Sequence, residues 1–488
     1  MANTKKNFAY NLILTLAGYI FPLLTYPYVS RVLGVTNLGT CNFIDGIIGY
    51  FILFADMGIG SYGVREIARY IDDKDRRNNV FSNLFVLSIV TTVISLLALI
   101  VCSYEIPSFA VYRPFLGIGA TKLIFNLFAV TWFFQGISDF RYITICSLIV
   151  RSIYVILVFI IVNDKSDTIL YYMLTTGTVV LTSIINWFYG KKYWTLSFKN
   201  LHIRLFLIPI LTFGFYRIVT SMYTSFNTVF LGFACDPTEV GYFTTATKLY
   251  SIIMSVFSAF TTVMVPRVAK LLKDKDYGHL QNIASDTFAL IIMFAIPIIA
   301  FCEFNAGDII YLLSGKGYEG AIIPFRIVIL LLLIIGFEQI IIQQFLMASS
   351  SNKAILCVGI VGVVIGVTMN IILTPRIASI GSALAWGCSE LGVLCSGAYL
   401  VKRVMNLSFN KNMIFRKLGE SIIFFVPFIM LFIPINHWIK FAISGIFIFF
   451  AFVWLNLYKD KNKYVVEIWN KFLGRIYTIK GGSGGQVP

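Results

Sequence analysis

The sequence predicts an all-α integral membrane protein with about fourteen transmembrane helices, and three observations lead to this prediction. Of the 488 residues, 58% are hydrophobic and only 13% are charged, whereas soluble globular proteins carry about 25% charged residues. The mean hydropathy is +0.83. Apolar runs of roughly 20 residues recur along the whole chain, and each is long enough to cross a hydrocarbon core of roughly 30 Å. A soluble protein is therefore excluded.

Fourteen apolar segments follow one another along the chain. They run approximately over residues 8–29, 41–63, 80–103, 114–136, 143–162, 169–189, 205–232, 242–265, 282–304, 325–348, 354–374, 381–401, 419–437 and 439–457. We expect no cleavable signal peptide, because the first run is too long for a signal-peptide core and lacks a small-residue cleavage site. The final stretch GGSGGQVP, residues 481–488, reads as an expression scar.

The distribution of basic residues predicts the orientation in the membrane. If the N-terminus is cytoplasmic, that side of the membrane holds 28 of the 39 Lys and Arg residues and the opposite side holds 6. The positive-inside rule then places both termini in the cytoplasm. The net charge of +16 fits an orientation signal beside anionic lipid headgroups, so we expect no nucleic-acid partner. The loops are too short for a soluble catalytic domain, so we expect no enzyme.

Two stretches about 200 residues apart indicate an internal duplication. The first runs from Pro27 to Ala68 and the second from Val229 to Ala269. Both carry Leu-Gly before a short loop, and both place a Gly 26 residues before an Arg, with an Asp seven residues beyond that Arg. The matched residues are Gly39 and Gly241, Arg65 and Arg267, and Asp72 and Asp274. Duplicated halves around a site at the membrane midplane are typical of transporters.

No metal or nucleotide site is indicated by the sequence. The eight cysteines are scattered singly without a Cys-x-x-Cys, and the three histidines fall in predicted loops. The phosphate-binding motif G-x-x-x-x-G-K-[S/T] is absent. We therefore expect no cofactor, and energy would come from the membrane potential, from consumption of the product, or from coupling to H⁺ or Na⁺.

Charged residues inside the predicted segments are the candidate functional groups. Each costs roughly 2.5–3.5 kcal/mol at a helix centre, so these residues must line a wet cavity or pair with one another. Arg326 and Glu303 lie near segment ends, and we expect their side chains to reach the membrane interface. For Arg151, a structural pairing and a functional role are equally expected. Asp45 and Asp56 are 11 residues apart, about three turns, and share one helix face.

The remaining charges are assigned three roles. A cationic cavity that binds an anionic substrate is predicted at Arg31, Lys122, Arg217 and Lys248. Coupling-ion or gating groups are predicted at Asp45, Asp56, Glu338 and Glu390, with helix packing as the alternative for Glu390. A cytoplasmic gate or loop is predicted at Arg65 and Arg267. Diphosphate is the most economical anion for such a cavity, and an acidic sugar is another. Asn126, Trp132 and Gln135 are candidates for contact with sugar rings, with packing as the more ordinary role.

Several motifs resemble a known family. PYVSRVLG, followed by NLGTCNF and ADMGIGSYGVREIA, resembles the N-terminal signature of the Wzx flippases of the polysaccharide transporter family. Residues 352–391 resemble segments 11 and 12 of that family. Arg31, Arg65 with Glu66, and Glu390 match positions in these motifs. One departure is Val35-Thr36-Asn37, which stands where a Gly-Pro-x pattern is common.

The resemblance implies both a fold and a function. The fold is two pseudo-symmetric six-helix bundles around a central cavity, which we place at residues 1–200 and 201–403, followed by two further helices and a basic cytoplasmic tail at 404–480. The implied function is transfer of undecaprenyl-diphosphate-linked oligosaccharide from the cytoplasmic to the outer leaflet of a bacterial inner membrane, by alternating access. Implied partners are the lipid bilayer and a polysaccharide polymerase with its chain-length regulator, and we expect a monomer.

Three alternatives remain open. A lipid II flippase shares the fourteen-helix plan, although its motifs resemble this chain less well. A cation-coupled multidrug exporter typically has twelve helices and an acidic site without this basic excess. A membrane-embedded glycosyltransferase or polymerase is disfavoured, because the longest outward loop, about 305–324, carries only Asp308 and Glu319 as carboxylates.

Overall fold

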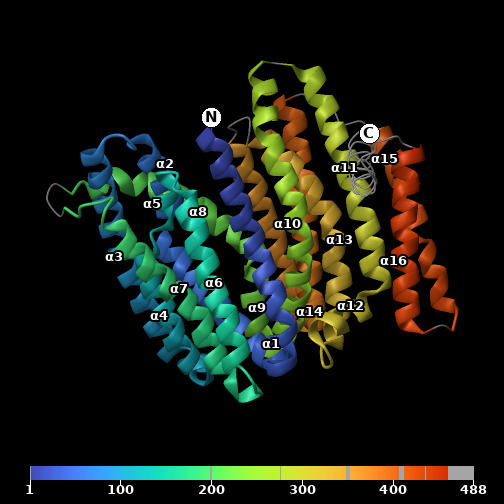
Figure 1. Cartoon of the computed structure of the whole chain (residues 1–488), viewed down its shortest axis with the longest axis horizontal. Helices are drawn as coiled ribbons and strands as arrows, with labels where there is room; N and C mark the ends of the chain where they lie inside the picture. Colours follow the sequence, from blue (N-terminus) through green and yellow to red (C-terminus); the bar gives the residue numbers. More distant parts are fainter. Residues whose placement is uncertain are drawn as a thin grey trace, which may run out of the picture. The chain divides into compact units, whose positions relative to one another are not determined.

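The computed structural model describes residues 2–197, 201–274, 276–347, 352–405, 411–434 and 436–459, and these residues contain no strand (Figure 1). The α-helices are α1 (Ala2–Asp56), α2 (Ile59–Arg69), α3 (Lys74–Glu105), α4 (Arg113–Ala129), α5 (Thr131–Gly136), α6 (Phe140–Ile161), α7 (Thr168–Gly190), α8 (Ile203–Thr224), α9 (Phe226–Ala234), α10 (Pro237–Lys273), α11 (Tyr277–Phe304), α12 (Ala306–Ser314), α13 (Ile322–Gln339), α14 (Asn352–Met405), α15 (Lys411–Glu420) and α16 (His437–Val453). Short 3-10 or π segments are η1 (Pro107–Tyr112), η2 (Lys165–Asp167), η3 (Glu319–Ala321), η4 (Ile340–Leu346), η5 (Ser421–Phe432) and η6 (Trp454–Lys459).

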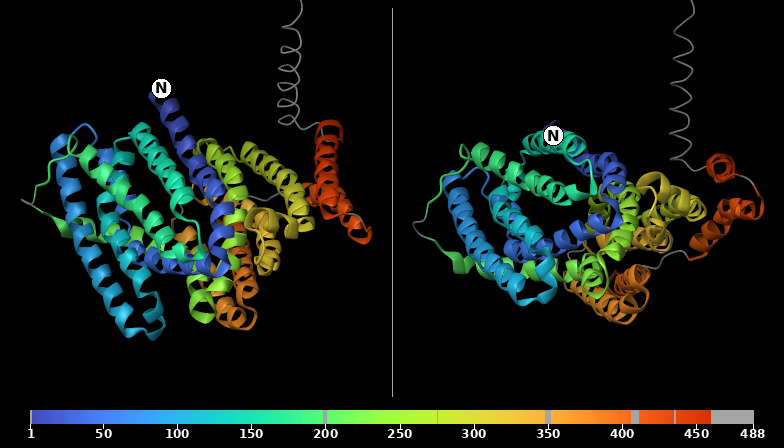
Figure 2. Two further views of the ribbon diagram at one scale, coloured as in Figure 1. Left: turned by 60° about the horizontal axis from the view of Figure 1, so that its bottom comes forward. Right: turned by 90° about the horizontal axis from the view of Figure 1, so that it is seen from below.

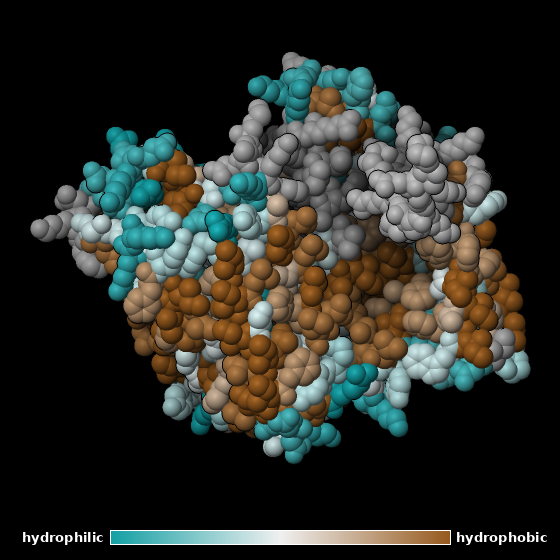
Figure 3. Space-filling view, viewed as in Figure 1, coloured by the Kyte–Doolittle hydropathy of each residue, from teal (hydrophilic) through white to brown (hydrophobic). Residues whose placement is uncertain are grey.

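The helices have the length and composition of membrane spans. Among the described residues, 10 helical stretches are long and apolar enough to cross a bilayer. On the face shown in Figure 3, apolar side chains cover the middle of α1 and α6, and polar side chains gather at the helix ends. The prediction of a multi-pass, all-α membrane protein is confirmed. The count of fourteen helices and the pseudo-symmetry stay predictions.

Helices α1 and α14 each run through a position where the sequence predicted a loop. The predicted boundary at residues 30–40 is a single non-helical residue, Gly34, with φ 77°. The boundary at residues 375–380 is a non-helical pair, Ile377 and Ala378. Conversely, the predicted segment 41–63 is interrupted by Met57 and Gly58, which both have positive φ. Because glycine adopts positive φ without a steric penalty, one residue can redirect a helix there without a loop.

The chain divides into two compact units. Unit 1 comprises residues 1–277 and 310–407, and unit 2 comprises residues 278–309 and 408–488. Within unit 2, α11 contacts α16 through the Phe301 and Phe441 rings and through a hydrogen bond from Asn305 Nδ2 to Ser444 Oγ of 3.0 Å. The domain boundaries predicted at residues 200 and 403 stay predictions.

Helices α2 and α5 lie at one end of unit 1, which we call the α2 end (Figure 1, with further ribbon views in Figure 2). An aromatic cluster forms the core of the unit near this end. Phe81, Phe133 and Phe134 are fully buried, and the Phe81 ring stacks on Trp194 with centroids 4.3 Å apart. Close helix packing continues the cluster, since a Cβ on Gly63 would lie 2.5 Å from the Trp132 ring. This core fixes α2, α3 and α5 against one another and against the chain that follows α7.

The opposite end of unit 1 is closed by a seam between α1 and α10, which we define by Thr36, Gly39 and Asn42 on α1. A Cβ on Gly39 would lie 1.8 Å from the Pro237 carbonyl oxygen and 2.8 Å from Gly241 N. Two hydrogen bonds flank this glycine contact: Thr36 Oγ1 with Thr238 Oγ1 at 2.9 Å, and Asn42 Nδ2 to Thr244 Oγ1 at 2.9 Å.

The seam joins residues that the sequence duplication matches. Each of its two hydrogen-bonded pairs is 202 residues apart, which is also the separation of Gly39 from Gly241 in the duplicated stretches. The two copies of the stretch therefore contact each other at corresponding positions, as two identical surfaces do across a two-fold axis.

Candidate functional site

A cavity of about 1320 Å³ lies within unit 1. Residues of α1, α2, α3, α4, α5, α8, α9, α10 and α14 line it. The lining reaches from Asn42 and Thr244 at the seam to Val64 and Gln135 at the α2 end. Many lining side chains are Ser, Thr and Asn, which can hydrogen-bond a polar guest or water. Such a cavity gives a polar group a route through the apolar layer.

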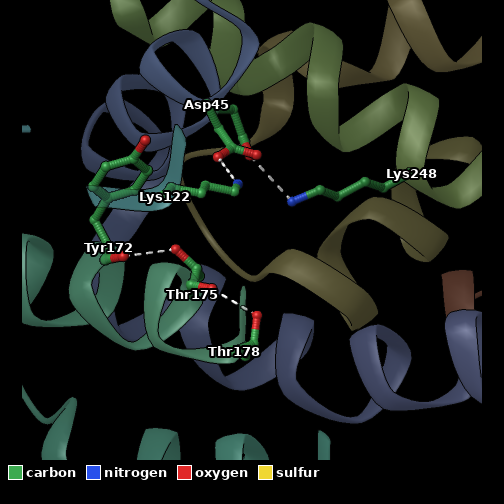
Figure 4. A network of polar contacts seen from close by, with 7 residues as sticks. Asp45, Lys122, Tyr172, Thr175, Thr178 and Lys248 are labelled. Carbon is green, nitrogen blue, oxygen red and sulfur yellow. Dashed lines mark hydrogen bonds and ion pairs between the residues drawn. The ribbon is translucent and has the colours of Figure 1, made fainter. Parts of the chain in front are cut away.

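At the seam side of the cavity, three charged side chains from three helices converge (Figure 4). Lys122 Nζ on α4 donates to Asp45 Oδ1 on α1. Lys248 on α10 points at the same carboxylate and interacts with it electrostatically, while its Nζ donates to Asn42 Oδ1 at 3.3 Å. Two lysines therefore share one carboxylate, so this cluster, which we call the Asp45 cluster, has a formal charge of +1.

The surroundings hold the Asp45 cluster in place. Lys248 Nζ lies 5.0 Å from the centroid of the Tyr26 ring, an arrangement that favours a cation over an aromatic face. The Tyr26 hydroxyl is itself fixed by a 2.6 Å hydrogen bond with Thr245 Oγ1 on α10. On α7, Thr175 and Thr178 satisfy their hydroxyls on carbonyls of their own helix (Figure 4). Of the two lysines, Lys248 belongs to the cavity lining and Lys122 does not.

Toward the α2 end, a second charge pair joins α1 to α8. Arg217 Nη1 donates to Asp56 Oδ2, and the same carboxylate accepts from Gly60 N at 3.1 Å. Backbone contact between two glycines sets the approach of α8, because a Cβ on Gly58 would lie 2.5 Å from Gly214 N. One cation meets one carboxylate here, so this pair is electrically neutral, and its Arg217 side chain is 43% exposed.

Two further predicted carboxylates lie outside the cavity lining. Glu390 on α14 is buried, Glu338 on α13 is half-buried with its Oε2 atom out of contact with solvent, and the two side chains interact with each other. Glu390 Oε1 accepts from Trp386 Nε1 at 2.7 Å, and Trp386 lines the cavity. Within the described ranges of the chain, neither glutamate has a Lys or Arg at ion-pair distance. Burial without a cation disfavours two free negative charges and favours a bound proton or cation.

The other predicted site residues lie apart from the cavity. Arg31 donates to the Leu312 carbonyl in the last turn of α12, where a cation favours the negative end of the helix. The Arg65 side chain on α2 is exposed, with its guanidinium 5.1 Å from the Tyr62 ring and 5.4 Å from the Phe213 ring of α8. Arg267 belongs to α10, and its side chain lies outside the described residues.

Residues that the sequence did not rank also form the site. Asn42 bridges Lys248 and Thr244, and the glycine contact between Gly58 and Gly214 positions Arg217. Asn42 stands one helical turn before Asp45, so its position on the same face as the two aspartates was a usable signal. Asn126, Trp132 and Gln135 line the cavity. In the part of the chain that the structure describes, no three His, Cys, Asp or Glu residues gather as a metal site would require.

Comparisons with known proteins agree on the class of molecule. A family model described as polysaccharide biosynthesis protein matches residues 4–272, more than half of the chain. An Escherichia coli K12 protein named "Putative O-antigen transporter" is 26% identical over 399 residues, which is 79% of this chain and 94% of that protein.

Two solved structures share the fold. The lipid II flippase MurJ in an inward closed conformation matches with a TM-score of 0.73 at 16% identity, over 93% of this chain and 99% of that one. An outward-facing multidrug resistance transporter of the MATE family matches with a TM-score of 0.56 at 17% identity, over 83% of this chain and 97% of that one. At these identities the likeness concerns the fold alone.

Proposed function

Because the chain belongs to the polysaccharide biosynthesis protein family, we propose that it is a flippase for undecaprenyl-diphosphate-linked oligosaccharide. It moves complete repeat units from the cytoplasmic to the outer leaflet of a bacterial inner membrane, for O-antigen, capsule or exopolysaccharide assembly. The observation that carries the proposal is a polar cavity of about 1320 Å³ inside a bundle of membrane-spanning helices, with one surplus positive charge at the Asp45 cluster.

The cavity has the properties that such a substrate requires. A sugar headgroup with a diphosphate cannot enter hydrocarbon without losing its hydrogen bonds to water, and a polar lining replaces them. Trp132 and Gln135 supply an aromatic face and an amide for sugar rings. Lys248, which lines the cavity, supplies an ammonium donor for the diphosphate, Lys122 compensates the charge of Asp45 behind it, and the prenyl tail stays in lipid. The relative from E. coli supports the substrate class through the name it bears.

Alternating access assigns a role to the seam. If both termini are cytoplasmic, the seam is the outer gate, closed here by the Gly39 contact and its two flanking hydrogen bonds. Opening requires α1 and α10 to separate, which breaks both bonds and frees Asn42, the residue that also holds Lys248. When the gate opens to release the substrate, Lys248, the cation that binds it, therefore loses its hydrogen bond to Asn42.

Coupling is assigned to the buried glutamates. Among the described residues, neither Glu338 nor Glu390 has a cation at ion-pair distance, and the Trp386 bond connects Glu390 to the cavity wall. A H⁺ or Na⁺ bound there would respond to the membrane potential and alter the wall through Trp386. The protein acts as a monomer in this proposal, and the polymerase and chain-length regulator take up the product in the outer leaflet.

Leaflet sidedness of the lipid-linked oligosaccharide tests the function. The protein is depleted in its own host, and the undecaprenyl-diphosphate oligosaccharide in each leaflet is quantified. We expect accumulation on the cytoplasmic side, corrected by the wild type and by the control Arg113→Gln, a surface cation, but not by Lys248→Gln at equal membrane abundance. Normal sidedness after depletion would overturn the proposal.

The same strain separates the proposed substrate from its rivals. If the chain complemented a lipid II flippase deletion, its substrate would be the peptidoglycan precursor instead. Drug hypersensitivity after depletion, with normal oligosaccharide sidedness, would assign multidrug export.

A further inference from the structure

A second cavity, of about 600 Å³, lies at the α2 end of unit 1 and shares no lining residue with the first. Four separate segments form it: the first turns of α1, the connection after α2 with the first turn of α3, the connection between α5 and α6 with the first turn of α6, and the residues after α7. Its charged lining residues are Lys6, Arg77, Asp139 and Arg141. We call it the basic pocket.

The basic pocket carries a surplus of positive charge. It holds three cations and one carboxylate, and in the described ranges of the chain none of the three cations lies within ion-pair distance of any carboxylate. Asp139 is occupied otherwise: its carboxylate accepts from Tyr142 N at 3.2 Å, from the Tyr189 hydroxyl at 3.2 Å and from the Tyr193 hydroxyl at 3.3 Å. The surplus charge is therefore left for a guest.

Arg77 is held in position before any ligand arrives. Its Nη1 donates to the Ile71 carbonyl at 2.8 Å and its Nη2 to the Tyr193 carbonyl at 3.2 Å. Its Nε is buried and has no hydrogen-bond partner. A guanidinium that is fixed in this way is suited to an oxyanion, because little side-chain freedom is lost when the ion binds.

The wall of the pocket is rigid and locally strained. The Tyr142 and Tyr189 rings stack with centroids 3.6 Å apart, and the Tyr193 ring lies 5.7 Å from that of Tyr189. Ser138, which also lines the pocket, has φ 60°, a conformation that a non-glycine residue adopts rarely. Strain of this kind persists where the surroundings over-determine the backbone, and it concentrates at binding sites.

We infer that the basic pocket binds a phosphate group. The convergence of Lys6, Arg77 and Arg141 on a preformed cavity at a helix end matches the chemistry by which proteins hold phosphate, through ammonium charge and guanidinium N–H donors. Two sources offer this group: the headgroup of an anionic phospholipid in the adjacent leaflet, or a soluble phosphate. Because the pocket joins the start of α1 to the segments before α3 and α6, its occupant stabilises the α2 end.

The test uses the purified full chain in nanodiscs of zwitterionic phosphatidylcholine. Either phosphatidylglycerol in the disc or inorganic phosphate in the buffer is added, and the midpoint of thermal unfolding is followed with each. We expect one of the two to raise the midpoint, and the double variant Lys6→Gln/Arg141→Gln to weaken the apparent affinity at least about tenfold. Neither residue makes a hydrogen bond within the described structure that its loss would break. Lys191→Gln, a neighbouring cation outside the lining, is the matched control and should respond as the wild type does.

The arms of the experiment identify the source. A response to inorganic phosphate alone assigns a soluble ligand, and a response to phosphatidylglycerol alone assigns a lipid headgroup. An equal response to oleate, an anionic lipid without phosphate, would overturn the assignment to phosphate. So would no response to either probe, or an unchanged response in the double variant. The measurement involves no transport, so its failure is distinguishable from failure of the proposed flippase.

Discussion

Two pairs of acidic residues lie within the helices of unit 1, and the protein neutralises them in opposite ways. Asp45 and Asp56 line the cavity, and each contacts a cation from another helix. Glu338, which is half-buried, and Glu390, which is buried, lie outside the cavity lining, next to each other and, among the described residues, without a cation at ion-pair distance. The two aspartates therefore hold cations at the cavity, while the two glutamates are suited to gain and lose a proton or cation.

A further contrast separates the two aspartates. Asp56 meets Arg217 alone, whereas Asp45 is shared by Lys122 and Lys248. The net charge of the cavity therefore resides at the seam side, where the outer gate is expected. Neutral pairs hold helices together, and a shared carboxylate leaves a cation available for substrate.

The largest effect is expected at the closed seam, which lies on the same side of the cavity as the Asp45 cluster. Gly39→Ala would place its Cβ 1.8 Å from a backbone oxygen that cannot move without displacing α10. Cross-linking of cysteines placed at positions 36 and 238, in a background without native cysteines, should fall by about tenfold or more, since steric overlap in a packed interface costs about 1–3 kcal/mol. Gly18→Ala, with nothing within 4 Å of its Cβ, is the matched control on the same helix. Undiminished cross-linking in Gly39→Ala would mean that the seam is not closed as described.

A smaller effect is expected at the neutral pair. Asp56→Asn leaves the Arg217 guanidinium without its carboxylate and should lower the free energy of unfolding by about 1–2 kcal/mol, a moderate loss because Arg217 is 43% exposed. The exchange Asp56→Arg with Arg217→Asp should recover part of this loss in a double-mutant cycle of thermal unfolding. A cycle with no coupling energy would show that the pair does not connect α1 to α8 energetically.

The smallest effect on stability is expected at the buried glutamates. Glu390→Gln keeps the shape of the side chain and an oxygen that accepts from Trp386 Nε1, so the free energy of unfolding should change by less than about 1 kcal/mol. Transport should nonetheless lose its dependence on the imposed H⁺ or Na⁺ gradient. If transport in vesicles containing Glu390→Gln still depended on the gradient, these glutamates would not be the coupling site, and they would not differ in function from Asp45 and Asp56 as described.

The sequence was informative wherever composition and helix geometry decide the outcome. The membrane class followed from hydropathy, and the common face of Asp45 and Asp56 followed from their spacing. The basic pocket brings Lys6, Arg77 and Tyr193 together, so the N-terminus and two predicted cytoplasmic loops lie at one end, as expected. The compartment that this end faces stays a prediction.

The pairing of charges between helices could not be derived from the sequence. It depends on which helices touch, and that is set by contacts such as Gly58 with Gly214 and Gly39 with Pro237, which involve backbone rather than side-chain pattern. For the same reason the sequence could not show that Arg31, predicted among the cavity cations from its place in the duplicated stretch, donates to the Leu312 carbonyl of α12. The sequence could not separate Glu338 and Glu390 from the two aspartates, because the burial of a side chain depends on how the helices pack.

The central claim is that the surplus cation of the Asp45 cluster receives the diphosphate, and binding of a short-chain polyprenyl diphosphate to the purified protein tests it most directly. Removal of a charged hydrogen-bond partner should make Lys248→Gln bind at least about tenfold more weakly than the wild type. Asp45→Asn, which frees both lysines, should bind as tightly or more tightly. Unchanged affinity in Lys248→Gln, or a loss in Asp45→Asn equal to that in Lys248→Gln, would contradict the account.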